Sequence, residues 1–142
     1  MNNPDESNSK QAFNDLLDYF SGNKNDNPDP IFHPDTSVNK MMFEHPTALR
    51  KASVLIPITR YRPGKNSEIV LTVRSKNLNS HPGQISLPGG SQDPDDLDVV
   101  ATALRESEDE IGLARSNVAV LGRLGEMAPP SGSPVTPILG LI

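Results

Sequence analysis

The sequence predicts an α+β or α/β fold in which a mixed β-sheet packs between helices. Three features carry this prediction: apolar, β-branched runs of strand length, a long Gly-rich loop, and one amphipathic helix after that loop. All of them lie within residues 46–142, which we expect to form one domain. Residues 1–45 are expected to hold one helix and a flexible linker.

The N-terminal part contains a single helical pattern. Within residues 10–20, Phe13, Leu16, Leu17 and Phe20 recur at helical spacing, which predicts a short amphipathic helix that packs on the domain. Residues 21–37 are rich in Asn, Asp and Pro and contain few apolar side chains. A segment of that composition buries too little surface to fold, so we predict a flexible linker there.

The strands of the domain are predicted from their apolar runs. Two of these runs flank the turn at residues 63–66 and are expected to pair, and two more follow the amphipathic helix. Their predicted ranges, in chain order, are 52–61, 68–74, 117–126 and 135–142.

Composition excludes several classes of function. The net charge is -5 and no segment gathers enough basic residues to neutralise a phosphate backbone, so we expect no nucleic-acid partner. The absence of cysteine excludes a disulfide framework, a thiolate nucleophile and a Cys-based zinc site. Residues 1–10 lack the apolar run of a signal peptide or membrane anchor, which predicts a cytoplasmic protein without a membrane partner.

A cluster of carboxylates on the predicted helix is the most informative pattern. The helix is expected over residues 95–111, with Asp93, Asp95 or Asp96 as N-cap and Gly112 as its C-terminal stop. Glu106, Asp109 and Glu110 share one face, within an arc of about 100°. Like charges so close repel one another, so a compensating cation is expected, with Mg²⁺ as the natural candidate. The alternative is an acidic face that only contacts water.

The other side of this helix is apolar, and we expect it to seat the helix on the sheet with Leu104 and Ile111 pointing inward. The acids would then face a cleft. Directly upstream, Gly89 and Gly90 allow the backbone to approach a charged ligand or metal closely, although an ordinary tight turn would explain them too. The loop at residues 75–94 is long, and long loops inside compact domains usually carry function.

The segment Arg105-Glu106-Ser107-Glu108-Asp109-Glu110-Ile111-Gly112 resembles the box of the Nudix family, R-E-x-x-E-E-x-G. This resemblance implies a Nudix-type sheet and hydrolysis of a small-molecule diphosphate. It further implies that Glu106, Asp109 and Glu110 bind Mg²⁺ or Mn²⁺. Glu106, Glu110 and Arg105 would be the catalytic set, with Arg105 holding a helix carboxylate, although an ordinary surface ion pair would also explain Arg105.

Two departures from the box alter what is expected. Asp109 stands where the family usually has Glu, so its contact with a metal is expected to pass through water because the side chain is shorter. Gly90 lies one residue farther from Arg105 than in the standard box, and the first Glu of the box is missing.

The upstream loop resembles the signature of the branch of this family that hydrolyses coenzyme A, L-T-x-R-S, three residues, R, three residues, G, three residues, F-P-G-G. The spacing is preserved, and the resemblance implies substrate contacts from Arg74, Gly83, Gly89 and Gly90. The implied products are 3',5'-ADP and 4'-phosphopantetheine. Asn79 replaces the second Arg and Leu87 the Phe, which would weaken binding of the phosphates of coenzyme A.

The chain ends on an apolar run, residues 139–142, where relatives in this family continue through another strand and a closing helix. We therefore expect a fold that is incomplete at its C-terminus. Three functions stay open: a Mg²⁺-dependent coenzyme A diphosphatase, a Nudix hydrolase of another nucleoside diphosphate derivative, and a catalytically impaired fragment or binding module.

Overall fold

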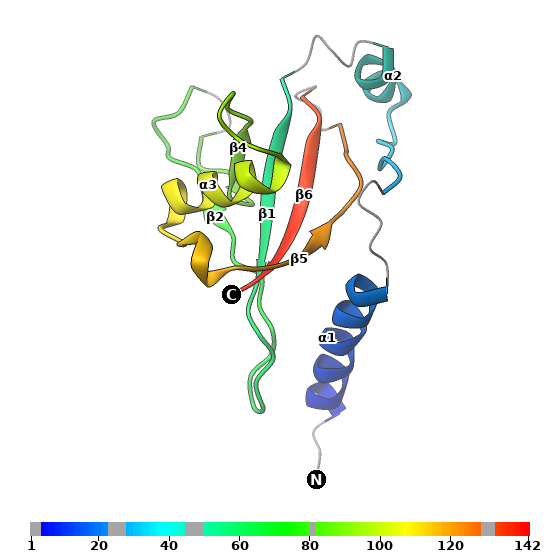
Figure 1. Ribbon diagram of the computed structural model, residues 1–142, viewed down its shortest axis with the longest axis vertical. Helices are drawn as coiled ribbons and strands as arrows, with labels where there is room; N and C mark the ends of the chain where they lie inside the picture. The colour runs from blue at the N-terminus through cyan, green and yellow to red at the C-terminus, as the bar shows by residue number, and fades with distance from the viewer. Residues whose placement is uncertain (1–3, 23–27, 45–49, 80–81, 129–132) are drawn as a thin grey trace.

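The computed structural model describes residues 4–22, 28–44, 50–79, 82–128 and 133–142, and within them a four-stranded mixed sheet forms the centre (Figure 1). The strand order is β4-β1-β6-β5. β1 and β6 run parallel, whereas β4 and β5 are antiparallel to their neighbours. The strands span β1, Ala52–Ile58; β4, Gly89–Ser91; β5, Ala119–Arg123; and β6, Val135–Leu141.

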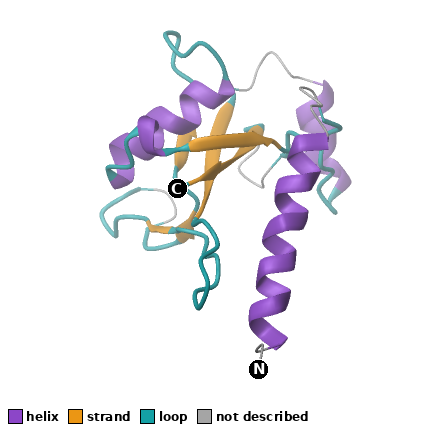
Figure 2. Ribbon diagram, turned by 60° about the horizontal axis from the view of Figure 1, so that its bottom comes forward, coloured by secondary structure: helices purple, strands orange, loops and turns teal. Residues whose placement is uncertain are grey.

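Helices cover both faces of the sheet, as Figure 2 shows. On one face, α3 (Val99–Ile111) packs through Ala103 against Leu55 and Ile138. On the other, α1 (Pro4–Gly22) places Phe20 among the side chains of the same strands. Because successive strand residues point to opposite faces, β1 and β6 supply both cores. The predicted mixed sheet between helices is therefore confirmed.

The second predicted strand is shorter than expected. Residues 68–74 continue beside β1 only briefly, through hydrogen bonds from Thr59 N to Glu68 O (2.9 Å) and from Val70 N to Pro57 O (3.0 Å). β4 pairs with Ala52–Val54 and so occupies the edge that a longer strand would need. The chain turns away instead, and β2 (Thr72–Val73) pairs with β3 (Ile85–Ser86) as a separate ribbon.

The N-terminal helix is longer than its apolar pattern indicated. It begins at Pro4, and Asp5 and Glu6 lie in its first turn, where Pro and acidic side chains are favourable. Its C-terminal end docks on β5, where Gly122 leaves room for the ring of Phe20. A Cβ atom at Gly122 would lie 2.5 Å from Phe20 Cδ1. No helix in the described part of the chain is long and apolar enough to cross a membrane.

The expected linker contains more structure than its composition indicated. A second helix, α2, spans Thr36–Glu44, and Ile31 forms a parallel bridge with Met127 through a hydrogen bond from Ile31 N to Glu126 O (2.9 Å). The domain boundary near residue 45 stays a prediction, since residues 45–49 lie outside the described ranges.

Candidate active site

Helix α3 positions the predicted acidic residues, and both of its ends are fixed by capping. The Asp98 side chain accepts a hydrogen bond from Ala101 N (2.8 Å), which makes Asp98 the N-cap. At the other end Gly112 takes the left-handed conformation (φ 66°) and its N–H donates to Glu108 O. The predicted stop at Gly112 is confirmed, whereas the predicted start near Asp95 is wrong because the preceding acids belong to the loop.

The apolar face of α3 meets the sheet in its middle turns. Thr102, Ala103 and Ser107 are buried, and Leu104 packs against the core around Leu55. Ile111, by contrast, is 38% exposed, so the expectation that it points inward is wrong. The chain reverses at Gly112, and Leu113 takes the place in the core that was expected for Ile111.

Arg105 joins three parts of the site. Its guanidinium donates two hydrogen bonds to Asp96, from Nε to Oδ1 and from Nη2 to Oδ2, both of 2.9 Å. Nη1 donates to Glu106 Oε1 (3.0 Å), and Nη2 also donates to Ser91 O in β4 (3.1 Å). The predicted contact of Arg105 with a helix carboxylate is therefore present, and it is part of a network rather than a surface pair.

Asp96, which was predicted as a candidate N-cap and lies near the place of the missing first Glu of the box, completes this network. Its side chain is 7% exposed and also accepts hydrogen bonds from Asp93 N and Thr102 Oγ1, each of 2.9 Å. The hydrogen bonds from Arg105 hold the pKa of Asp96 well below its usual range, so it remains ionised. The sequence feature that indicates this role is the acidic turn at residues 93–96, which supplies a carboxylate for an ion pair with Arg105.

Glu106 lies against the β4 backbone, where Gly90 leaves room for its carboxylate. A Cβ atom at Gly90 would lie 2.5 Å from Glu106 Cδ and 2.6 Å from Oε1. Glycine is needed at position 89 for a different reason, because a Cβ atom there would collide with Ser53 O and Val54 of β1. Of these two predicted ligand-contacting glycines, Gly90 thus creates the space for a carboxylate, and Gly89 allows β4 to pair closely with β1.

Glu110 lies beside Glu106 and faces a small cavity. Loss of hydration is the main cause that raises the pKa of Glu110, and the charge of Glu106 adds to it, whereas a hydrogen bond from the Gly89 backbone and the charge of Arg74 lower it. The cavity has a volume of about 230 Å³. Its lining residues are Thr72, Val73, Arg74, Ser75, Leu78 and Glu110.

Arg74 is the cation of this cavity. Its Nε is buried and lacks a hydrogen-bond partner, and no ion pair within 4 Å joins it to another described residue. The sequence left open whether Arg74 contacts a substrate phosphate or pairs with a helix acid. The structure places it near Glu110 but without a direct ion pair, which leaves its guanidinium available to an anionic ligand.

Asp109 and Gly83 do not join the two glutamates. Asp109 is 67% exposed, and among the described residues its ion-pair contact is with Arg105, at 3.9 Å. On an α-helix Glu110 lies about 40° from Glu106, whereas Asp109 lies about 60° to the other side. Within the described ranges no three Asp, Glu or His side chains converge on one point. Gly83 has a backbone role, since it adopts φ 70° and its N–H donates to Arg74 O (3.0 Å).

The sequence of residues 49–137 matches the family model of the NUDIX domain. The chain belongs to the Nudix family. Two relatives, the uncharacterized Nudix hydrolases NudL of Yersinia pestis (strain Pestoides F) and Yersinia pseudotuberculosis serotype O:1b (strain IP 31758), are each 47% identical over 93 residues. The match covers 66% of this chain and 45% of each relative, so it spans less than half of their length.

Solved Nudix structures share the fold. A Nudix hydrolase from M. smegmatis, RenU, matches with a TM-score of 0.53 and 22% identity over 65% of this chain and 60% of that chain. The binary complex of a C. elegans Ap4A hydrolase matches with a TM-score of 0.53 and 20% identity over 64% of each chain. These similarities agree with the helix-covered mixed sheet described above.

Proposed function

We propose that this Nudix domain hydrolyses a diphosphate bond, and that coenzyme A or one of its derivatives supplies it. The observation that carries the proposal is a cavity lined by both Glu110 and Arg74, whose Nε has no hydrogen-bond partner. The same cavity thus has a carboxylate that could bind a metal ion, Glu110, and a cation that could bind a phosphate, Arg74. Diphosphate hydrolysis requires both kinds of group.

A divalent cation fits the pair Glu106 and Glu110. The two carboxylates interact closely enough for the charge of Glu106 to raise the pKa of Glu110, which a bound cation would reverse. Mg²⁺ usually takes one or two carboxylates from a protein and completes its coordination with water and substrate phosphates. Two glutamates therefore suffice, and Asp109 would act at most through water. Glu106 and Glu110 would hold the ion, and bound Mg²⁺ or Mn²⁺ would supply neutralisation of phosphate charge and a lower pKa for an attacking water.

The residues of this chain would supply binding and orientation. Arg105 holds the carboxylate of Glu106, and the Gly89 backbone orients that of Glu110. Arg74 would bind a phosphate oxygen through its guanidinium group, which forms no ion pair with another described residue. Water would then add to one phosphorus atom, the P–O bond of the anhydride would break, and two phosphate monoesters would form with release of about one to two protons at neutral pH. No covalent intermediate is required.

The substrate assignment rests on the loop signature around Arg74 and Gly83. Residues 71–75, Gly83 and residues 88–90 keep the pattern and spacing of the coenzyme A branch. Asn79, an exposed residue of this loop, removes one guanidinium from the pattern. This substitution favours, as a second candidate, a nucleoside diphosphate derivative that lacks the additional phosphate of coenzyme A.

Product analysis separates the candidates. Purified protein is incubated with coenzyme A and Mg²⁺, and the products are identified by liquid chromatography and mass spectrometry. We expect 3',5'-ADP and 4'-phosphopantetheine, and none of either when EDTA replaces Mg²⁺. A panel of nucleoside diphosphate derivatives, tested with the natural protein and with Asn79→Arg, checks the specificity. Cleavage of another diphosphate but not of coenzyme A would support the second candidate, and no cleavage of any would refute both.

A further inference from the structure

A second, larger cavity lies at the hairpin that follows β1. The hairpin spans residues 59–68, and the cavity has a volume of about 930 Å³, within the range of small-molecule sites. No residue lines both this cavity and the one beside Glu110. The lining residues are Thr59, Arg60, Arg62, Lys65, Asn66, Glu68, Leu113, Asn117 and Ile142.

Three cations of the hairpin face this volume without a carboxylate partner. Arg60, Arg62 and Lys65 are exposed, and in the part of the chain that the structure describes no ion pair within 4 Å involves any of them. Arg50 and Arg115, in contrast, each lie 3.4 Å from a carboxylate oxygen. The hairpin thus concentrates unneutralised positive charge on a protein whose net charge is -5.

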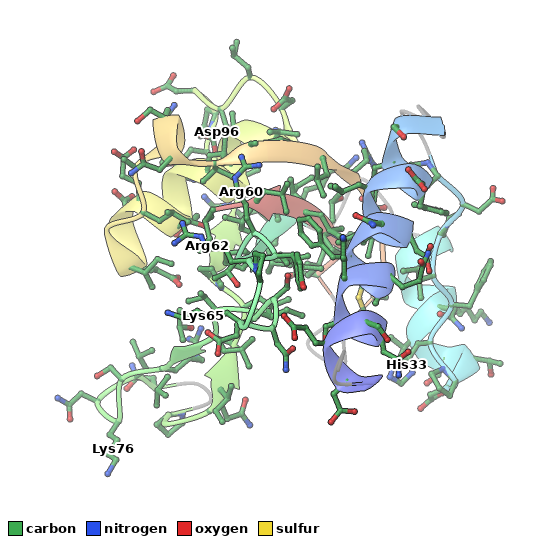
Figure 3. The ribbon with its side chains drawn as sticks, turned by 90° about the horizontal axis from the view of Figure 1, so that it is seen from below. His33, Arg60, Arg62, Lys65, Lys76 and Asp96 are labelled. Carbon is green, nitrogen blue, oxygen red and sulfur yellow. The ribbon has the colours of Figure 1, made fainter. Side chains whose placement is uncertain are left out.

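The hairpin is held in place from the side of α1. Gly64 N donates to Glu6 Oε1 (2.7 Å), Ser9 Oγ donates to Asn66 Oδ1 (2.8 Å), and the ring of Phe13 packs 6.4 Å from that of Tyr61. In Figure 3 the labelled side chains Arg60, Arg62 and Lys65 come from the hairpin, with α1 to its right. Fixed backbone positions reduce the ordering cost when such side chains bind a ligand.

We propose that this hairpin cavity is a binding site for the phosphate group of a nucleotide. Among the lining side chains are three cations and one carboxylate, that of Glu68, which leaves an excess of about two positive side-chain charges. A phosphate monoester carries a charge of about -1.5 to -2 at neutral pH. A guanidinium group can bind two oxygens of one phosphate through two parallel hydrogen bonds. Leu113 and Ile142 give an apolar wall for a base, and the amide NH2 group of Asn66 and the side-chain amide of Asn117 offer hydrogen-bonding groups to its edge.

The binding experiment uses ADP in the presence of EDTA, so that it does not depend on metal binding or on hydrolysis. Amide NMR spectra of the whole chain are recorded during the titration. We expect saturable shifts of the Lys65, Asn66 and Asn117 amides with ADP and none with adenosine, which lacks phosphate. Absence of hairpin shifts at millimolar ADP, or equal shifts with adenosine, would overturn the proposal whether or not the protein hydrolyses diphosphates.

Variants locate the site. Arg60→Gln and Arg62→Gln are each expected to raise the Kd for ADP about tenfold or more, because each removes charge-assisted hydrogen bonds. Arg115→Gln removes the same charge outside the cavity and is expected to leave the Kd within about twofold. Equal effects of the three substitutions would show binding by net charge alone and refute the site. Unchanged melting temperatures check that each variant is folded.

The same variants identify the source of the nucleotide. Coenzyme A, also titrated in EDTA, carries a phosphorylated adenosine. If Arg60→Gln and Arg62→Gln weaken coenzyme A and ADP alike, the cavity binds the nucleotide end of the substrate. If they weaken only ADP, it binds a separate nucleotide. Unchanged affinity for both ligands would contradict the proposal.

Discussion

Gly90→Ala tests how the β4 backbone positions Glu106. The substitution adds one methyl group. It introduces no backbone strain, because Gly90 does not have the positive φ angle that favours glycine. The new Cβ atom would lie 2.5 Å from Glu106 Cδ. That is about 1 Å short of the separation at which carbon atoms pack. The backbone of β4 is paired with β1, so the Glu106 carboxylate must move instead.

The expected loss follows from that displacement. A misplacement of about 1 Å in a reacting constellation costs about a hundredfold in rate, or about 2.7 kcal/mol of activation free energy. A metal ligand shifted this far also weakens metal binding, by roughly ten- to a hundredfold for comparable perturbations. The hydrogen bond from Arg105 Nη1 to Glu106 Oε1 would be strained at the same time.

Steady-state hydrolysis with Mg²⁺ gives the rate, and electron paramagnetic resonance with Mn²⁺ gives metal affinity independently of turnover. Gly22→Ala is the control, since a Cβ atom there meets no other atom within 4 Å. In the background of Glu106→Ala, Gly90→Ala should add little because the group it displaces is gone. The reasoning is refuted if folded Gly90→Ala protein retains the natural rate and Mn²⁺ affinity.

Three further predictions concern stability and are measured by urea unfolding. Asp98→Ala should lower the free energy of unfolding by about 1 kcal/mol through loss of the N-cap, whereas Asp98→Ser should retain most of it. Phe20→Ala should cost about 3–5 kcal/mol if α1 forms part of the core; a change below about 1 kcal/mol would contradict its docking. Arg105 lowers the pKa of Asp96 in the folded state, so as the pH falls Asp96 is protonated in the unfolded chain before it is protonated in the folded protein. The contribution of this contact to the free energy of unfolding should therefore be complete above the ordinary pKa of 3.8 and decrease as the pH drops below it. Asp96→Asn should remove this part of the pH dependence, and an unchanged profile would count against the Arg105 contact.

Features set by neighbouring residues were predictable from the sequence. The stop of α3 at Gly112 follows from the conformational freedom of glycine, and the buried middle of that helix follows from the spacing of its apolar side chains. The last strand was expected over residues 135–142 and spans Val135–Leu141. Glu106 and Glu110 were expected on one face, and the structure places them together.

Features set by distant contacts were not predictable in the same way. Asp96 and Arg105 are nine residues apart, and only the path of the loop shows that they pair. Ile111 fits the apolar arc of the helix, but the turn at Gly112 gives its place to Leu113. Asp109 fits the acidic arc of the helix. Because Glu106 points toward β4, however, the side chain of Asp109 faces solvent. Similarly, β4 occupies the edge of β1 that a longer second strand would have used.

The most direct test compares coenzyme A hydrolysis by Glu110→Gln and Glu108→Gln at saturating Mg²⁺. Both substitutions replace a helix glutamate by its amide, but Glu110 faces the cavity with Arg74, whereas Glu108 pairs with Arg115 (3.4 Å) away from it. We predict that Glu110→Gln lowers kcat at least about a hundredfold and that Glu108→Gln stays within about twofold of the natural protein. Equal rates for the two variants would contradict a catalytic site at Glu110.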